Sequence, residues 1–256
     1  MSEEKAKPTG PIPPYFETID GELAVGGKTA MALVAEAGDT PLFVYSTAAL
    51  DARIGELRAA MPTQLGIHYA MKANPFAPLL GWMKDKVDGF DVASGGELKL
   101  ALGAGVAADK ISFAGPGKRD RELEFAIANG VTLNCESEGE AERAFAISER
   151  LGVAPKIAVR VNPSFDLKGS GMKMGGGAKP FGVDADRVPA LVRRIIAAGA
   201  DWRGFHIYAG SQALDAEAII AMQAQTLALA TELAEVVGAA PPKVNLGGGF
   251  GIPYFP

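Results

Sequence analysis

A lysine closes a short apolar stretch of the sequence, and this position suits covalent chemistry with a carbonyl compound. The stretch at residues 65–72 reads Leu-Gly-Ile-His-Tyr-Ala-Met-Lys, which is typical of a buried strand. Because side chains alternate between the two faces of a strand, His68, Ala70 and Lys72 are expected on one face. A desolvated lysine loses proton affinity and becomes a nucleophile for carbonyl groups. The alternative is an ordinary lysine that reaches from the strand end into solvent.

Polar side chains also occupy one face of three other predicted strands, where their neighbours in sequence are apolar. They are Asp91 in the strand near 89–94, Arg160 and Asn162 near 156–162, and His206 and Tyr208 near 203–209. Burying charge is costly unless the charge is paired. We therefore interpret the shared face of Lys72, Asp91, Arg160 and His206 as a binding site, with a satisfied structural network as the alternative.

A glycine-rich loop follows the last predicted strand and is a candidate for binding an anion. Backbone N–H groups in Gly247, Gly248 and Gly249 can converge on such a ligand, although a tight turn is the usual alternative. Ser211 follows the preceding strand and adds a hydroxyl donor. Barrels often hold phosphate with the loops after their last two strands, so these residues predict a phosphate site. Another glycine-rich segment, 169–182, is predicted to be a loop at the mouth of the site or to be disordered.

Strands and helices alternate along the chain, which favours a parallel sheet with helices outside it. A strand at 42–45 and a helix capped by Ser46 or Thr47 come first. Strands are then expected near residues 65–72, 89–94, 110–115, 131–136, 156–162, 203–209 and 243–247. Helices are expected near 76–86, 95–103, 119–129, 137–151, 184–199 and 213–237. A (β/α)₈ barrel needs eight strand units and seven follow residue 65, so the count leaves an open doubly wound sheet as an alternative.

Composition limits the class of protein. The 256 residues are 48% hydrophobic, which supports a sizeable core, and their net charge of −5 argues against nucleic acid or an anionic membrane as the main partner. The single cysteine, Cys135, fits a reducing compartment, so we expect a cytoplasmic protein. Residues 1–40 are predicted to be a tail and lead-in, mobile over 1–14, and residues 41–256 to be the barrel.

Several motifs, in order and spacing, resemble one enzyme family. They are Tyr-Ala-Met-Lys-Ala-Asn-Pro at 69–75, Gly-Phe-Asp-Val-Ala-Ser-Gly-Gly-Glu-Leu at 89–98, Phe-Ala-Gly-Pro-Gly-Lys at 113–118, Arg-Val-Asn-Pro at 160–163, Gly-Ser-Gln at 210–212 and Gly-Gly-Gly-Phe-Gly at 247–251. The chain resembles the decarboxylases that bind pyridoxal phosphate on an alanine-racemase-like, fold-type III barrel of the TIM type. Diaminopimelate and ornithine decarboxylases belong to this family. The motifs look most like the branch associated with exosortase A systems and exopolysaccharide genes.

The resemblance implies a role for each candidate residue. Lys72 would hold the cofactor as a Schiff base, and Asp91 would lie near that lysine and the substrate amine. Arg160 would stand near the cofactor ring. Ser211 and the glycines at 247–249 would hold its phosphate. The family's ring-stacking histidine falls at Tyr208, while His206 matches the earlier histidine of a His-x-His form, so either residue is a candidate for stacking. No metal site is expected.

The resemblance also implies an activity. We expect decarboxylation of an amino acid or a carrier-bound aminoacyl group, by a protein that is a homodimer at full length. A racemase or epimerase on the same fold, or a non-catalytic protein that binds pyridoxal phosphate, is the alternative. The family's last barrel strand and its C-terminal β domain are expected after residue 256, so the 256-residue chain alone is expected to be inactive.

Overall fold

The computed structural model describes residues 15–165, 172–173, 177 and 179–253 of the chain. Contacts divide the chain into two compact units, one comprising Met1–Gly66 with Pro253–Pro256 and the other Ile67–Ile252. The tail predicted at 1–14 and much of the loop predicted at 169–182 lie outside the described residues. All of the candidate site residues belong to the second unit.

The first unit contains more regular structure than the sequence predicts. Its elements are β1 (Glu17–Ile19), β2 (Glu22–Val25), β3 (Lys28–Thr29), α1 (Ala30–Ala37) and α2 (Thr47–Ala60). The three strands form an antiparallel sheet in the order β1-β2-β3. Its two hairpins turn at Asp20-Gly21 and Gly26-Gly27, and all four residues have the positive φ that tight two-residue hairpins favour.

The strand predicted at residues 42–45 is wrong. These residues have no strand conformation, and Phe43 is 80% exposed. A strand needs a hydrogen-bonded neighbouring strand, and no described strand pairs with this segment, so its apolar composition alone was misleading. The helix that follows is confirmed as α2, and the hydroxyl of Ser46 caps it by accepting the Ala49 N–H at 3.2 Å.

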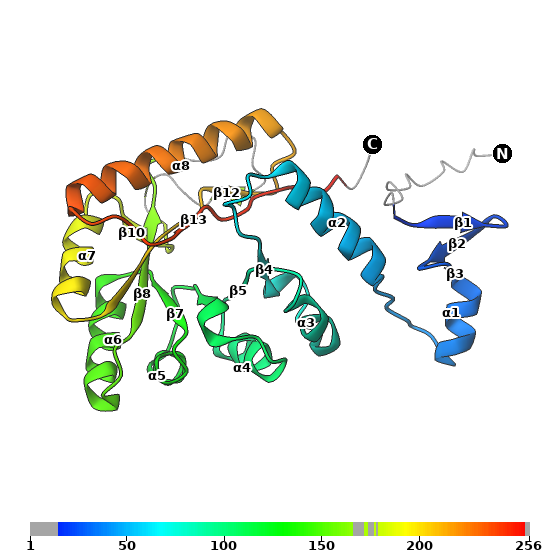
Figure 1. The fold of residues 1–256 in the computed structure, drawn as a ribbon, viewed down its shortest axis with the longest axis horizontal. Helices are drawn as coiled ribbons and strands as arrows, with labels where there is room; N and C mark the ends of the chain where they lie inside the picture. The colour runs from blue at the N-terminus through cyan, green and yellow to red at the C-terminus, as the bar shows by residue number, and fades with distance from the viewer. Residues whose placement is uncertain (1–14, 166–171, 174–176, 178, 254–256) are drawn as a thin grey trace, which may run out of the picture. The chain divides into compact units, whose positions relative to one another are not determined.

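The second unit is built around a curled parallel sheet (Figure 1). Its strands are β4 (His68–Ala70), β5 (Gly89–Val92), β6 (Ile111–Phe113), β7 (Thr132–Cys135), β8 (Lys156–Asn162), β11 (Asp201–Ile207) and β13 (Val244–Asn245). They are hydrogen-bonded in the order β13-β11-β8-β7-β6-β5-β4, and every neighbouring pair is parallel. Among the described residues, β4 and β13 are therefore the two edges of the sheet.

Three short strands complete the second unit. β10 (Val183–Asp184) pairs in parallel with the carboxyl end of β8. β9 (Met172–Lys173) and β12 (Gly210–Ser211) form a small antiparallel pair. β10 also delays the next helix, which was predicted from residue 184 but begins at Val188, directly before a proline at one of its first positions.

Six helices lie along the outside of the curled sheet (Figure 1). They are α3 (Ala77–Met83), α4 (Gly95–Gly103), α5 (Asp120–Ala128), α6 (Glu138–Leu151), α7 (Val188–Ala197) and α8 (Ala216–Val237). Side chains of Ser94, Ser137 and Asp215 cap three of them, which explains why these helices begin where they do. None of the described helices combines the length and apolarity that a membrane span needs.

The strand faces divide as their alternation predicts. Phe90 and Val92 are almost fully buried, as are Phe205 and Ile207, while the polar residues between them occupy the opposite face. The seven strands predicted from residue 65 onward are all present, although most are shorter than expected. The curled parallel sheet agrees with a barrel of the TIM type, whereas closure by an eighth strand stays a prediction.

Candidate active site

Lys72 lies just beyond the carboxyl end of β4, in a single turn of 3-10 helix, η1 (Met71–Ala73). The strand therefore ends two residues earlier than predicted. The hydroxyl of Tyr69 donates a hydrogen bond to the Asn74 carbonyl oxygen at 3.0 Å across this turn. Because Met71 is completely buried, it anchors the turn and fixes where the lysine leaves the sheet.

The amine of Lys72 has a ring beside it and no acidic partner among the described residues. Its Nζ lies 5.7 Å from the centroid of the Tyr208 ring, within the range of a cation–π contact. No carboxylate in the described part of the chain pairs with it. The side chain is exposed, so the described residues do not provide the desolvation that the predicted buried strand implied. What they provide is an amine that is free to form a covalent bond.

Asp91 lies on β5 and is held by side chains from both edge strands. His68 Nδ1 on β4 is 3.2 Å from its Oδ1, and Asn245 Nδ2 on β13 is 3.3 Å from its Oδ2. Burial alone would raise the pKa of this carboxyl group. The hydrogen bond from His68, with smaller contributions from His206 and Asn245, outweighs burial and lowers the pKa below its usual value. Asp91 is therefore an ionised group at neutral pH.

Arg160 lies on β8 and is buried, with Glu136 as its ionic partner. Its Nη1 is 3.1 Å and 3.2 Å from the two carboxylate oxygens of Glu136. Glu136 also accepts the backbone N–H groups of Gly115 and Gly182, so its hydrogen-bonding capacity is well used. The guanidinium carbon of Arg160 lies 4.9 Å from the centroid of the Phe181 ring. Arg160 is thus fixed on two sides.

A second buried ion pair supports Glu136. Lys118 Nζ is 2.6 Å from Glu140 Oε1, and both side chains are 1% exposed. The same amine donates to the carbonyl oxygens of Gly115 and Asn134, at 2.7 Å and 2.9 Å. Burial raises the pKa of Glu140, and Lys118 opposes that rise. The other Glu140 oxygen accepts the Glu136 N–H at 3.2 Å, which links the two pairs.

His206 stands between Arg160 and Asn245 in the register of three adjacent strands, β8, β11 and β13. Its ring is buried, and none of the described residues accepts from or donates to its Nδ1. Burial first, and then the positive charge of Arg160, lower the pKa of His206 to about 4. The ring is therefore neutral at pH 7 and has an unfilled hydrogen-bonding position.

Tyr208 follows the last residue of β11, and its ring packs on the backbone of the glycine loop. Gly247 has φ +68°, and a Cβ atom at that position would collide with the Tyr208 ring. The glycine is needed both for its backbone conformation and for the space. Tyr208 is therefore held between the loop and the amine of Lys72, at the carboxyl end of the strands.

The two loops predicted to hold phosphate are adjacent. The N–H of Ala213 donates to the Gly249 carbonyl at 2.9 Å, and the N–H of Gly251 donates back to the Ala213 carbonyl at 2.7 Å. The N–H of Gly247 is taken by Asn245 Oδ1 at 2.8 Å. By contrast, no described acceptor takes the N–H groups of Gly248 and Gly249 or the hydroxyl of Ser211. These three donors remain available to an anion.

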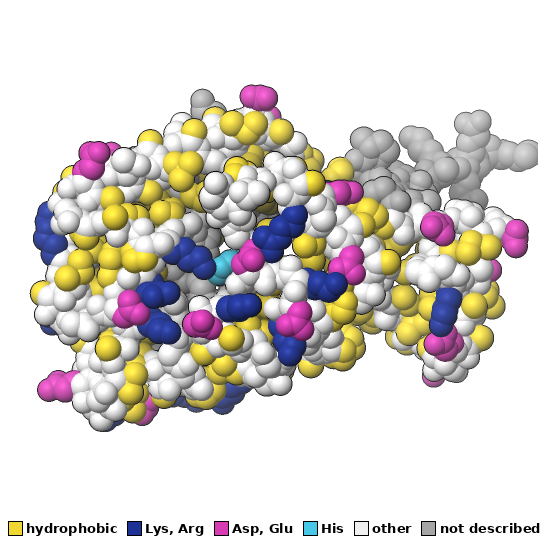
Figure 2. Space-filling view, viewed as in Figure 1, with side chains coloured by type: hydrophobic (Ala, Val, Ile, Leu, Met, Phe, Trp, Pro, Cys, Tyr) yellow, Lys and Arg dark blue, Asp and Glu magenta, His cyan; other side chains and the backbone are white. Residues whose placement is uncertain are grey.

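The structure thus brings the predicted residues together in two layers. Asp91, Arg160 and His206 lie on the strands, and Lys72 and Tyr208 lie just past the strand ends. Figure 2 shows a hollow at the centre of the curled sheet, in which one histidine is visible between acidic and basic side chains. Within the described part of the chain, an amine without a carboxylate partner, a buried ring nitrogen without a hydrogen bond and free loop donors fit pyridoxal phosphate.

Some residues of the site were missed by reasoning from sequence. Glu136 ends a predicted strand in a segment that resembles the family, but nothing in its spacing indicates that it pairs with Arg160. Asn245 and His68 both contact Asp91, and the signal for both was their polar character in short apolar strands. Lys118 lies in a loop, where no periodicity could indicate that it is buried.

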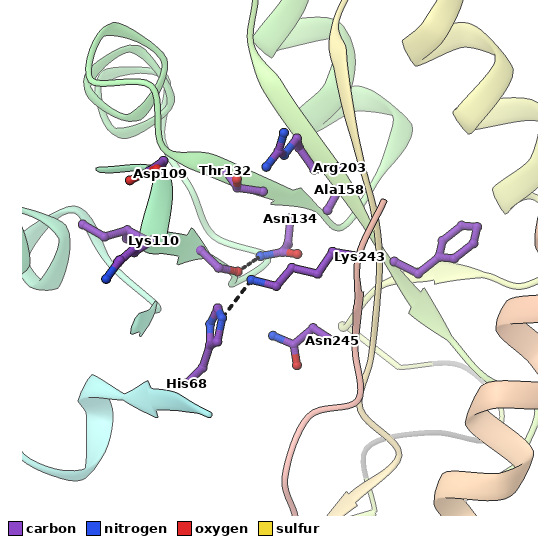
Figure 3. A pocket seen from close by; sticks show the side chains of 12 residues that line it. His68, Asp109, Lys110, Thr132, Asn134, Ala158, Arg203, Lys243 and Asn245 are labelled. Carbon is purple, nitrogen blue, oxygen red and sulfur yellow. Dashed lines mark hydrogen bonds between the residues drawn. The ribbon is translucent and has the colours of Figure 1, made fainter. Parts of the chain in front are cut away.

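The cavity drawn in Figure 3 lies at the opposite end of the sheet from Lys72. Its lining includes the residues at which strands begin, such as His68, Ile111 and Thr132, together with Lys243 just before β13. Its volume of about 40 Å³ admits water but not a coenzyme. Barrel enzymes carry out their chemistry at the carboxyl ends of the strands, so this cavity is not the cofactor site.

Comparison with known proteins agrees with this geometry. Residues 47–255 match the family described as pyridoxal-dependent decarboxylase, pyridoxal binding domain. Over 219 residues the chain is 32% identical to L-glutamyl-[BtrI acyl-carrier protein] decarboxylase of Niallia circulans, covering 85% of this chain and 51% of that protein. It is 35% identical over 248 residues to diaminopimelate decarboxylase of Aquifex aeolicus, covering 95% and 58%.

A solved structure shows the same fold. The crystal structure of diaminopimelate decarboxylase from M. jannaschii superposes with a TM-score of 0.82 at 28% identity, covering 94% of this chain and 58% of that one. The chain spans only about half the length of the curated relatives that it matches. With a family match over most of its residues, the chain belongs to the pyridoxal-dependent decarboxylases, as their pyridoxal-binding domain.

Proposed function

We propose that this chain provides the cofactor-binding barrel of a decarboxylase that acts on an amino acid or a carrier-bound aminoacyl group. The observation that carries the proposal is the amine of Lys72, which has no carboxylate partner among the described residues and faces the Tyr208 ring at the carboxyl end of β4. Bound pyridoxal phosphate supplies an electron sink for the charge that the departing carboxyl group leaves behind.

Each residue has a proposed task in holding that cofactor. Lys72 binds it covalently, and the Tyr208 ring stacks on it, since both meet at the strand ends. The free N–H groups of Gly248 and Gly249, with the Ser211 hydroxyl, bind its phosphate.

The strand residues below the ring control charge. Asp91, ionised by its neighbours, attracts the cationic amine of an incoming substrate. Arg160 keeps a positive charge close to the site. Its hydrogen bonds to Glu136 fix the position of the guanidinium group. His206 offers a neutral ring with one open hydrogen-bonding position, and it is the second candidate for contact with the cofactor.

The first test is covalent labelling. The protein is incubated with pyridoxal phosphate, reduced with borohydride and digested, and the labelled peptide is identified by mass spectrometry. We expect a visible absorption band before reduction and label on Lys72 after it. Label on Lys84, Lys173 or Lys179 instead would show that the assignment is wrong.

A second measurement separates decarboxylation from the alternatives. Amino acids and aminoacyl carriers labelled in the carboxyl carbon are incubated with the full-length protein. Release of labelled carbon dioxide supports a decarboxylase, whereas retention of the label with inversion of the α-carbon would show a racemase or epimerase. Cofactor binding with neither reaction would show a non-catalytic protein.

The substrate class follows from the relatives and is part of the proposal. One relative is named for a glutamyl group on an acyl-carrier protein and another for diaminopimelate. Substrates of both kinds present an α-amino acid, for which an ionised Asp91 at the strand face is suited. The labelled panel therefore includes free diaminopimelate and a glutamyl group attached to an acyl-carrier protein.

The remaining expectations extend the proposal to the whole protein. We propose that residues 41–256 form the barrel, that the protein forms a homodimer in the cytoplasm, and that it belongs to the exosortase A-associated branch. The motifs at 113–118 and 247–251 support that branch. Light scattering of the full-length protein tests the dimer, and a monomer with full activity would contradict it.

A further inference from the structure

A chain of hydrogen-bonded side chains leads from the cavity at the strand starts to Asp91. Lys243 Nζ is 2.9 Å from His68 Nε2, and His68 Nδ1 is 3.2 Å from Asp91 Oδ1. Figure 3 shows the first of these contacts, with Lys243 and His68 pointing toward each other across the cavity. The proposed function gives neither Lys243 nor His68 a task.

The chemistry of these groups fixes the direction of both hydrogen bonds. An ammonium group can only donate, so His68 Nε2 must be the acceptor and carry no proton. The proton of a neutral imidazole then sits on Nδ1, from which it is donated to the carboxylate of Asp91.

This series of hydrogen-bonded side chains includes residues from both edges of the curled sheet. His68 begins β4, and Lys243 directly precedes β13, which is the other edge strand in the described sheet. Asn245 on β13 donates to the second oxygen of Asp91 at 3.3 Å. The carboxylate of Asp91 is therefore held by one donor from each edge, and neither donor is a backbone group.

We propose that His68 and Lys243 are positioning residues that hold Asp91 ionised and correctly oriented from the end of the barrel opposite the cofactor. Lys243 selects the imidazole tautomer, and His68 transmits that choice to Asp91 as a directed hydrogen bond. The inference rests on the proposed function, because orienting Asp91 matters only if Asp91 faces the substrate.

Other charged groups surround the Lys243–His68–Asp91 series and contribute to the pH dependence of its hydrogen bonds. Arg203, Lys110 and Asp109 line the same cavity, and Arg203 is partly neutralised by Asp201 at 3.4 Å. On the other side of Asp91, the neutral ring of His206 and the positively charged Arg160 lie in register on adjacent strands. Among the described residues, His68 alone both lines the cavity and bonds to Asp91 through a ring that can exist in two tautomers.

The test measures Asp91 itself in the cofactor-free chain, by carbon-13 NMR of labelled aspartate with Asp91→Asn for assignment. His68→Phe keeps a ring but removes the donor, so the pKa of Asp91 is expected to rise by about one unit. His68→Asn restores an N–H close to the position of Nδ1 and is expected to reverse most of that rise. Lys110→Met, which removes a cation from the cavity but no bond to His68, is the control and is expected to change nothing.

A second readout covers the case in which His68→Phe fails to fold. Nitrogen-15 NMR of the parent is expected to show His68 with its proton on Nδ1, and Lys243→Met is expected to shift the tautomer balance toward Nε2. An unchanged Asp91 pKa in folded His68→Phe, or an unchanged tautomer in Lys243→Met, would overturn the proposal and leave these contacts as ties between strand edges. Borohydride labelling of Lys72 in the same variants reports the proposed function separately, and it is expected to persist.

Discussion

Two groups of polar side chains in the second unit differ in how fully their ionic and hydrogen-bonding partners are supplied. In the first, Lys118 pairs with Glu140 and Arg160 pairs with Glu136, and backbone N–H groups take up the remaining oxygens. In the second, the Lys72 amine has no carboxylate partner and the Nδ1 atom of His206 has no hydrogen-bond partner among the described residues.

This difference distinguishes a cluster that stabilises the fold from one that can bind a ligand. Buried polar groups in folded proteins are almost always hydrogen-bonded, so a cluster whose members all have partners needs no ligand to explain it. A buried polar atom without a described partner, such as His206 Nδ1, calls for a ligand, and the exposed amine of Lys72 is free to react with one. The closed cluster, Lys118–Glu140 with Arg160–Glu136, should therefore control stability. The open cluster, Lys72 with His206, should control what the protein binds.

The largest expected effect comes from removing the amine of the open cluster. Lys72→Ala should abolish the visible cofactor band, and decarboxylation by the full-length protein should fall about a thousandfold or more. Folding should be unaffected, because the side chain is exposed. Absorbance and release of labelled carbon dioxide measure the two losses.

A matched lysine tests whether position, rather than charge, matters at residue 72. Lys99 is also exposed and lies 5.6 Å from the centroid of the Phe125 ring, so Lys99→Ala removes a similar cation from a similar ring contact. It should retain the cofactor band and the activity. If both variants lose the cofactor equally, the amine of Lys72 is not the attachment point.

The next effect concerns the closed cluster. Lys118→Met leaves Glu140 buried without its cation and should lower the free energy of unfolding by about 3–5 kcal/mol. Replacing both partners, with Lys118→Met and Glu140→Leu, should recover much of that loss, because no uncompensated charge then remains. Urea denaturation at pH 7 measures both variants.

A comparison with an exposed lysine tests whether the closed cluster stabilises the fold. An exposed lysine such as Lys99 should cost within about 0.5 kcal/mol when changed to Met. If Lys118→Met costs as little as Lys99→Met, the buried pair contributes nothing that an exposed residue would not.

A smaller effect should appear in the pH dependence of stability. His206 has a native pKa of about 4, whereas an unfolded histidine titrates near ~6.5. The unfolded chain therefore takes up the proton first as pH falls, and the native state loses about 2–3 kcal/mol between pH 7 and pH 4.5. His206→Gln should lack this part of the acid loss. Equal losses in both proteins, measured by urea denaturation, would contradict the buried neutral ring.

The sequence predicted the parallel sheet well because burial leaves a clear pattern. Alternation around Asp91 and His206 marked both the apolar face and the polar face, and the structure confirms that division. Residues 42–45 carried the same apolar signal without a described strand beside them, and there the prediction failed. Composition indicates which segments favour a strand, but only pairing makes one.

The individual residues of the site could be predicted from the sequence, but the contacts between their side chains could not. Alternation placed Asp91 and Arg160 on the polar face, but the contacts of Asp91 with His68 and of Arg160 with Glu136 depend on register and curl. Lys72 was expected in a strand and lies in a turn, because the chain bends once Met71 is buried. Such long-range pairings leave no periodic trace in one sequence.

The smallest expected effect lies where the open cluster meets the glycine loop. The Tyr208 ring packs against the backbone at Gly247 and lies 5.7 Å from Lys72 Nζ, which places it to stack on a cofactor bound to that amine. Offset stacking contributes about 0.5–1.5 kcal/mol beyond burial, so Tyr208→Ala should weaken binding of pyridoxal phosphate roughly two- to tenfold. Tyr208→Phe keeps the ring and should bind nearly normally. Both affinities are measured by titrating the full-length protein with cofactor. If Tyr208→Ala binds as tightly as its parent with the fold intact, the ring only fills space, and the open nitrogen of His206 becomes the better candidate for contact with the cofactor.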